Sequence, residues 1–83
     1  MTESVTFAQL DSVLAQLGFR KSIVAKSHVA YRHDASDTVL LFPPQRAGDA
    51  VSAGLMVGTR KVLLDRGLVE AERLDEMLHA TAA

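Results

Sequence analysis

The sequence predicts an α+β fold, a two-layer α-β-β-β-α sandwich with an additional C-terminal helix. The prediction comes from two observations: apolar residues recur at helical spacing near both ends of the chain, and three short runs of β-branched and aromatic residues lie between them. A length of 83 residues fits one domain, 1–83, whose core would bury roughly 60–65% of the surface of the extended chain.

The first predicted helix covers residues 6–17. Its apolar residues form one stripe at helical spacing: Phe7, Leu10, Val13, Leu14 and Leu17. Thr6 and Gln9 have the spacing of a capping box, in which each side chain bonds the backbone amide of the other residue. Gly18 follows where a left-handed residue would end the helix.

Three predicted strands follow as an antiparallel meander. The first two are the runs FRKSIVA (19–25) and SHVAYRH (27–33), and the turn-forming residues DASD (34–37) join the second to TVLLF (38–42). Pro43 ends the third strand because proline cannot donate a hydrogen bond to the ladder.

Helical spacing returns after the third strand. Residues 52–66 fit a second helix, but Gly54 and Gly58 each weaken a helix by about 1 kcal/mol, so the sequence predicts helix over 59–66 and leaves the first half open between helix and loop. A third helix is predicted from about residue 70 to the tail, with an apolar stripe in an otherwise acidic segment. Such a helix serves either ordinary packing or the docking of a partner protein.

One face of the predicted sheet is the candidate functional surface. In the second strand Val29 and Tyr31 point to one side, which we expect the helices to cover, and His28, Ala30 and Arg32 point to the other. The third strand is apolar on both faces, so two of its residues need cover from elsewhere. The sequence therefore predicts a protein partner or a homodimer formed through this strand.

The composition excludes several kinds of site. There are no cysteines, and the three histidines lack the spacing of metal ligands, so we expect no metal and no cofactor. No apolar run is long enough to cross a membrane and no signal peptide is recognisable, which predicts a cytoplasmic protein without membrane contact. The net charge of −1 provides no overall attraction to nucleic acid, although a local basic patch would.

Several short motifs follow one another in an order that is similar to that of a known family. Gly18-Phe19 closes the first helix, Lys26-Ser27-His28 opens the second strand, Pro43 closes the third, and the run GTRKVLLDRGL (58–68) follows. This pattern resembles the HicA (YcfA-like) family of toxin mRNA interferases, which has a Gly-Ser-His triplet at the second of these positions. The resemblance spans most of the chain. It implies the fold of double-stranded-RNA-binding domains, metal-independent endoribonuclease activity on mRNA, His28 as the catalytic residue, and a HicB-type antitoxin as partner.

Metal-independent RNA cleavage needs a base for the 2′-hydroxyl proton, an acid for the leaving 5′-oxygen and positive charge at the phosphate. Histidine suits the proton transfers because both of its forms are accessible at neutral pH, so His28 is the predicted general base. Lys26, two residues back on the same strand face, is a candidate phosphate contact. The other candidate substrate contacts depend on how the helices dock: Lys21, Arg32, Arg60 and Lys61. His33 points to the face opposite His28, which weighs against a two-histidine mechanism.

Lys26 departs from the family triplet, which has glycine at this position, and the segment before it lacks the basic residues of the family. Two hypotheses therefore stay open. In the first, the chain is an RNA-binding ribonuclease toxin that an antitoxin neutralises. In the second, it is a catalytically inactive relative that uses the fold for protein–protein contact or self-association.

Overall fold

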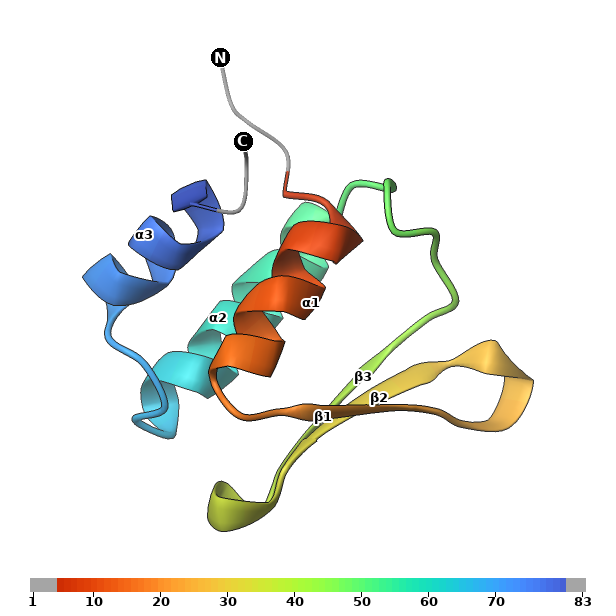
Figure 1. Ribbon diagram of the computed structural model, residues 1–83, viewed down its shortest axis with the longest axis horizontal. Helices are drawn as coiled ribbons and strands as arrows, with labels where there is room; N and C mark the ends of the chain where they lie inside the picture. Colours follow the sequence, from red (N-terminus) through yellow and green to blue (C-terminus); the bar gives the residue numbers. More distant parts are fainter. Residues whose placement is uncertain (1–4, 81–83) are drawn as a thin grey trace.

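The computed structural model describes residues 5–80, apart from the side chains of Ser27 and Ala80. Over these residues the fold is α+β, with three α-helices and one three-stranded antiparallel sheet, as the sequence predicts (Figure 1). In chain order the elements are α1 (Phe7–Gln16), β1 (Arg20–Ile23), β2 (Val29–His33), β3 (Thr38–Phe42), α2 (Ala53–Asp65) and α3 (Ala71–Ala80). The strands are joined by two short 3₁₀ turns, Ala25–Ser27 and Asp34–Ser36.

Helix α1 begins with the predicted capping box. The backbone amide of Gln9 donates to Thr6 Oγ1 at 3.2 Å, and the amide of Thr6 donates to Gln9 Oε1 at 2.7 Å. Gly18 follows the helix with a φ of +97°, a conformation that a side chain would strain. The buried stripe of the helix consists of Leu10, Val13 and Leu14.

The sheet has the strand order β1-β2-β3, so β2 is central and the other two strands are edges. Tyr31 of β2 is aligned with Lys21 of β1 and Leu40 of β3. Tyr31 and Leu40 belong to the hydrophobic core and Lys21 pairs with Asp11 of α1, so this side of the sheet faces the helices. Burial alternates along β3, where Thr38, Leu40 and Phe42 are buried. Because Tyr31 is only 6% exposed, the predicted orientation of β2 is confirmed.

Helix α2 is longer than the predicted 59–66, because it begins at Ala53 and includes both glycines. The Ser52 hydroxyl caps the helix by accepting a hydrogen bond from the amide of Leu55 at 3.2 Å. Leu55 and Met56 also pack against the core. The cap and these tertiary contacts offset the low helix propensity of the glycines, so the first half is helical.

The loop after β3, residues 43–52, returns the chain to the start of α1. The amide of Val51 donates to the carbonyl of Val5 at 2.7 Å, and the amide of Phe7 donates to the carbonyl of Asp49 at 3.0 Å. These backbone bonds tie the loop to the helix layer and set where α2 begins.

Helix α3 packs beside α1 and lies away from the sheet (Figure 1). Leu74 and Met77 are buried, as expected from the predicted apolar stripe. Gly67 stands between α2 and α3 with a φ of +68°, so glycine permits the turn without strain.

Candidate functional site

The side of the sheet that faces away from the helices is termed the open face. By cross-strand alignment it consists of Arg20, Ser22, Ala30, Arg32, Val39 and Leu41. Val39 is 52% exposed and Leu41 is 59% exposed. The expectation that two apolar residues of the third strand lack cover is therefore confirmed. Neighbouring exposed apolar side chains of this kind are typical of contact surfaces.

His28 lies at the end of the β1–β2 turn, directly before β2. Its backbone is extended, with φ −66° and ψ 149°, and its carbonyl accepts from the amide of Val24 at 2.8 Å. The alternation of β2 therefore continues to His28 and places its ring on the side of the open face. The residue is half-buried, and its ring forms no hydrogen bond or ion pair with any other side chain that the structure describes.

The prediction that Lys26 shares a strand face with His28 is wrong. Lys26 stands inside the β1–β2 turn, with φ 61° and ψ 31°, and is exposed. The chain must reverse between the two strands, and a residue in the left-handed region serves that reversal. Glycine adopts this conformation without strain, so the backbone here suits the glycine of the family that the sequence resembles. The side chain of Ser27, the middle residue of the triplet, lies outside the described part of the chain.

The candidate cations divide into two groups. Lys26 and Arg32, like His28, form no ion pair within residues 5–80. The other three are paired with carboxylates: Lys21 with Asp11 at 3.4 Å, Arg60 with Asp75 at 2.5 Å, and Lys61 with Asp65 at 2.9 Å. Helix α2, which carries Arg60 and Lys61, lies well apart from the β1–β2 turn (Figure 1). The six candidates therefore do not converge on one site.

A second polar group, which no sequence motif signals, lies between α1 and the sheet. The Tyr31 hydroxyl donates to Asp11 Oδ1 at 2.6 Å, and Lys21 Nζ lies 3.4 Å from the same oxygen. Burial, and then the hydrogen bond to Asp11 and its negative charge, raise the pKa of Tyr31 well above its usual range. These residues border a hollow of about 190 Å³, which also has Phe7 and Phe42 in its walls. This volume is below that of typical small-molecule sites, so we assign the group a structural role.

His33 is separated from His28 by the sheet. Its Nδ1 atom lies 2.7 Å from Ser36 Oγ, and its ring centroid lies 5.1 Å from that of the buried Phe19. His33 therefore faces the helix side, which confirms the prediction that the two histidines point to opposite faces. A mechanism that uses both rings at one phosphate does not fit this arrangement.

Two further observations concern the described residues as a whole. Within 5–80, no three His, Cys, Asp or Glu side chains are grouped so that they could hold a metal ion. None of the helices in this range is long and apolar enough to cross a membrane.

Comparisons with family models, with curated proteins and with solved structures find no match. The resemblance to the HicA family therefore rests on the sequence motifs, and what it implies for this chain is a proposal. The geometry itself defines a small α+β domain with one helix-covered sheet face and one open face.

Proposed function

We propose that this chain is a HicA-like, RNA-directed domain in which His28 is the general base of metal-independent cleavage. The proposal is carried by the distribution of ion pairs: Lys26, His28 and Arg32 form none within the described chain, and all three belong to β2 or the turn before it. The two cations of this set, Lys26 and Arg32, are neutralised by no carboxylate of the described chain and are available to the phosphates of a nucleic acid.

In the proposed reaction the 2′-hydroxyl oxygen attacks the adjacent phosphorus while its proton passes to His28, and the 5′-oxygen leaves. Because His33 is bonded on the other side of the sheet, the leaving oxygen takes its proton from water or from the protonated His28. The exposed Lys26 is two residues from His28 and can contact the scissile phosphate. Arg32 is four residues along the strand, about 13 Å away, and would contact a neighbouring phosphate instead.

The test is cleavage of single-stranded RNA by the purified protein in the presence of EDTA. We expect His28→Ala to abolish cleavage. Arg32→Gln should weaken RNA binding and reduce the slope of log affinity against log salt by about 1. Lys61→Gln is the matched control, because it also removes one cation but from an ion pair on α2. Equal cleavage by the native protein and His28→Ala would contradict the proposal.

The partner expected for this function is a HicB-type antitoxin that covers His28. The exposed Val39 and Leu41 lie on the same side of the sheet and would give such a partner an apolar contact. A complex of this kind should protect RNA from cleavage at a one-to-one ratio, which a titration of the two proteins measures.

A second candidate function is a non-catalytic relative that uses the open face for protein contact or for a homodimer through β3. The exposure of Val39 and Leu41 favours it. Sedimentation over a range of concentrations tests self-association, and replacing both residues by threonine should abolish it, because threonine is polar but still has a high propensity for strands. A protein that stays monomeric and binds RNA with a steep salt dependence would exclude this function, since an apolar interface responds little to salt.

A further inference from the structure

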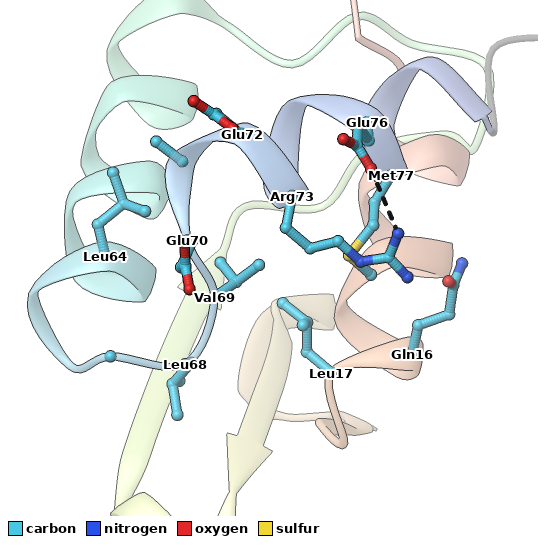
Figure 2. Close-up of a pocket in the computed structure, with 12 residues that line it drawn as sticks. Gln16, Leu17, Leu64, Leu68, Val69, Glu70, Glu72, Arg73, Glu76 and Met77 are labelled. Carbon is cyan, nitrogen blue, oxygen red and sulfur yellow. Dashed lines mark ion pairs between the residues drawn. The ribbon is translucent and has the colours of Figure 1, made fainter.

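A groove lies between the C-terminal end of α1, the α2–α3 turn and α3, away from the open face. Its volume is about 900 Å³ (Figure 2). The apolar part of its lining comes from these three segments and from the last turn of α2: Leu17, Leu64, Leu68, Val69 and Met77. The walls are helices and a turn, so no strand edge offers backbone hydrogen bonds to an occupant. An occupant must therefore satisfy its own backbone groups, as a helix does.

The rim of this groove is acidic. Glu70, Glu72 and Glu76 line it, and the one cation among the lining residues, Arg73, is paired with Glu76 at 3.5 Å (Figure 2). Glu70 and Glu72 form no ion pair within residues 5–80. Their uncompensated charge repels phosphates and attracts cations, so a basic partner complements this rim and an RNA does not.

We propose that this groove docks a basic amphipathic helix of another protein, with apolar side chains against Leu17 and Val69 and with Lys or Arg side chains beside Glu70 and Glu72. A second copy of this chain does not supply such a helix from its described residues. Among the cations without ion pairs in the described chain, Lys26, Arg32 and Arg46 lie on a turn, a strand and a loop, and Arg66 stands alone at the end of α2, where it donates to the Ser36 carbonyl. The α2 cations Arg60 and Lys61 are held by carboxylates. The site is independent of the function proposed for His28.

The probe is a synthetic amphipathic peptide of leucine and lysine, about 14 residues long, which spans roughly 21 Å as a helix. The matched control peptide has glutamate in place of every lysine. We expect the lysine peptide to bind and to shift the amide NMR signals of residues 67–77 and of the end of α1. The glutamate peptide should bind at least about tenfold more weakly, because its charge repels the rim.

Variants of the protein separate this groove from general attraction to an acidic surface. Glu70→Gln with Glu72→Gln should weaken binding of the lysine peptide about three- to tenfold. Asp34→Asn with Asp37→Asn removes the same charge at the β2–β3 turn and should leave the affinity within about twofold.

A variant in the apolar lining of the groove gives a second measurement. Val69→Thr nearly preserves the shape of the side chain. It should weaken binding of the lysine peptide about threefold, because it places a hydroxyl in the apolar lining of the groove. The proposal is overturned if Glu70→Gln with Glu72→Gln binds as tightly as the native protein, or if the peptide shifts signals of the open face instead of the groove.

Discussion

Replacement of Lys26 by glycine tests whether the β1–β2 turn carries a cost that the family triplet avoids. Lys26 has a φ of 61°, and the left-handed conformation costs a residue with a side chain about 1–2 kcal/mol. Glycine removes that cost but adds about 0.4–1 kcal/mol of conformational entropy to the unfolded chain. We therefore expect Lys26→Gly to raise the free energy of unfolding by about 0.5–1 kcal/mol.

The control for this prediction is Lys26→Ala, which removes the same ammonium group but keeps a Cβ in the strained conformation. Urea unfolding followed by circular dichroism should show a gain for Lys26→Gly and none for Lys26→Ala. In a domain of this size, a gain of about 0.5–1 kcal/mol corresponds to a rise of about 2–8 °C in Tm. Equal stability of the two variants would refute the assignment of strain to this turn.

The same pair of variants separates two roles of Lys26 in RNA recognition. If its ammonium contacts a phosphate, both variants lose RNA affinity and share a reduced salt slope. If the close approach of backbone to RNA matters instead, Lys26→Gly gains affinity and Lys26→Ala does not. Filter binding over a salt series measures both quantities.

Four further substitutions have expected effects on stability. Gly58→Ala should raise the free energy of unfolding by about 0.5–1 kcal/mol, since no heavy atom beyond its chain neighbours and the adjacent backbone of its own helix lies within 4 Å of the added Cβ. Gly67→Ala should lower the free energy of unfolding because the φ of this residue is +68°. Thermal unfolding of both variants checks the sign. Thr6→Ala should cost about 1 kcal/mol through loss of the cap, measured by urea unfolding. The raised pKa of Tyr31 means that the unfolded chain releases this proton first, so its stabilisation is complete below about pH 10 and is lost as the pH rises further. Tyr31→Phe should flatten that alkaline loss in unfolding measurements between about pH 9 and pH 11, and an unchanged slope would contradict the role of its hydroxyl.

The elements that could be predicted from the sequence are those whose determinants are local. The capping box at Thr6, the apolar spacing of α1 and the β-branched and apolar run of β3 act within a few residues, and they have the predicted positions. Which residues of β3 are buried depends on the helices, because the strand is apolar on both faces. The start of α2 depends on contacts that Leu55 and Met56 make with the distant core, so a local reading of its glycines places it too late. The left-handed turn at Lys26 could not be predicted from the sequence either, because the residues on both sides of it favour strands.

The candidate site likewise contains features that the local sequence predicts and features that depend on how the helices dock. Alternation alone places His28 and Arg32 on one side of β2, and the structure agrees. The carboxylates that neutralise Lys21 and Arg60 come from elements distant in the chain, so their pairing depends on how the helices dock. Lys61 is the exception, because its partner lies four residues along the same helix and the pair can be predicted from spacing.

The net charge of −1 is the sum of a region with unpaired cations and a region with unpaired carboxylates. Among the cations without ion pairs in the described chain, Lys26 lies in the β1–β2 turn next to His28 and Arg32 lies farther along β2. Glu70 and Glu72, which form no ion pair within residues 5–80, lie at the start of α3. The β1–β2 turn and α3 are at opposite ends of the view in Figure 1. If the chain binds RNA as proposed, a phosphate backbone is attracted to the β1–β2 turn and repelled from the start of α3. A near-neutral total charge is thus compatible with the proposed RNA recognition, and the acidic end is free at the same time for the proposed basic helix.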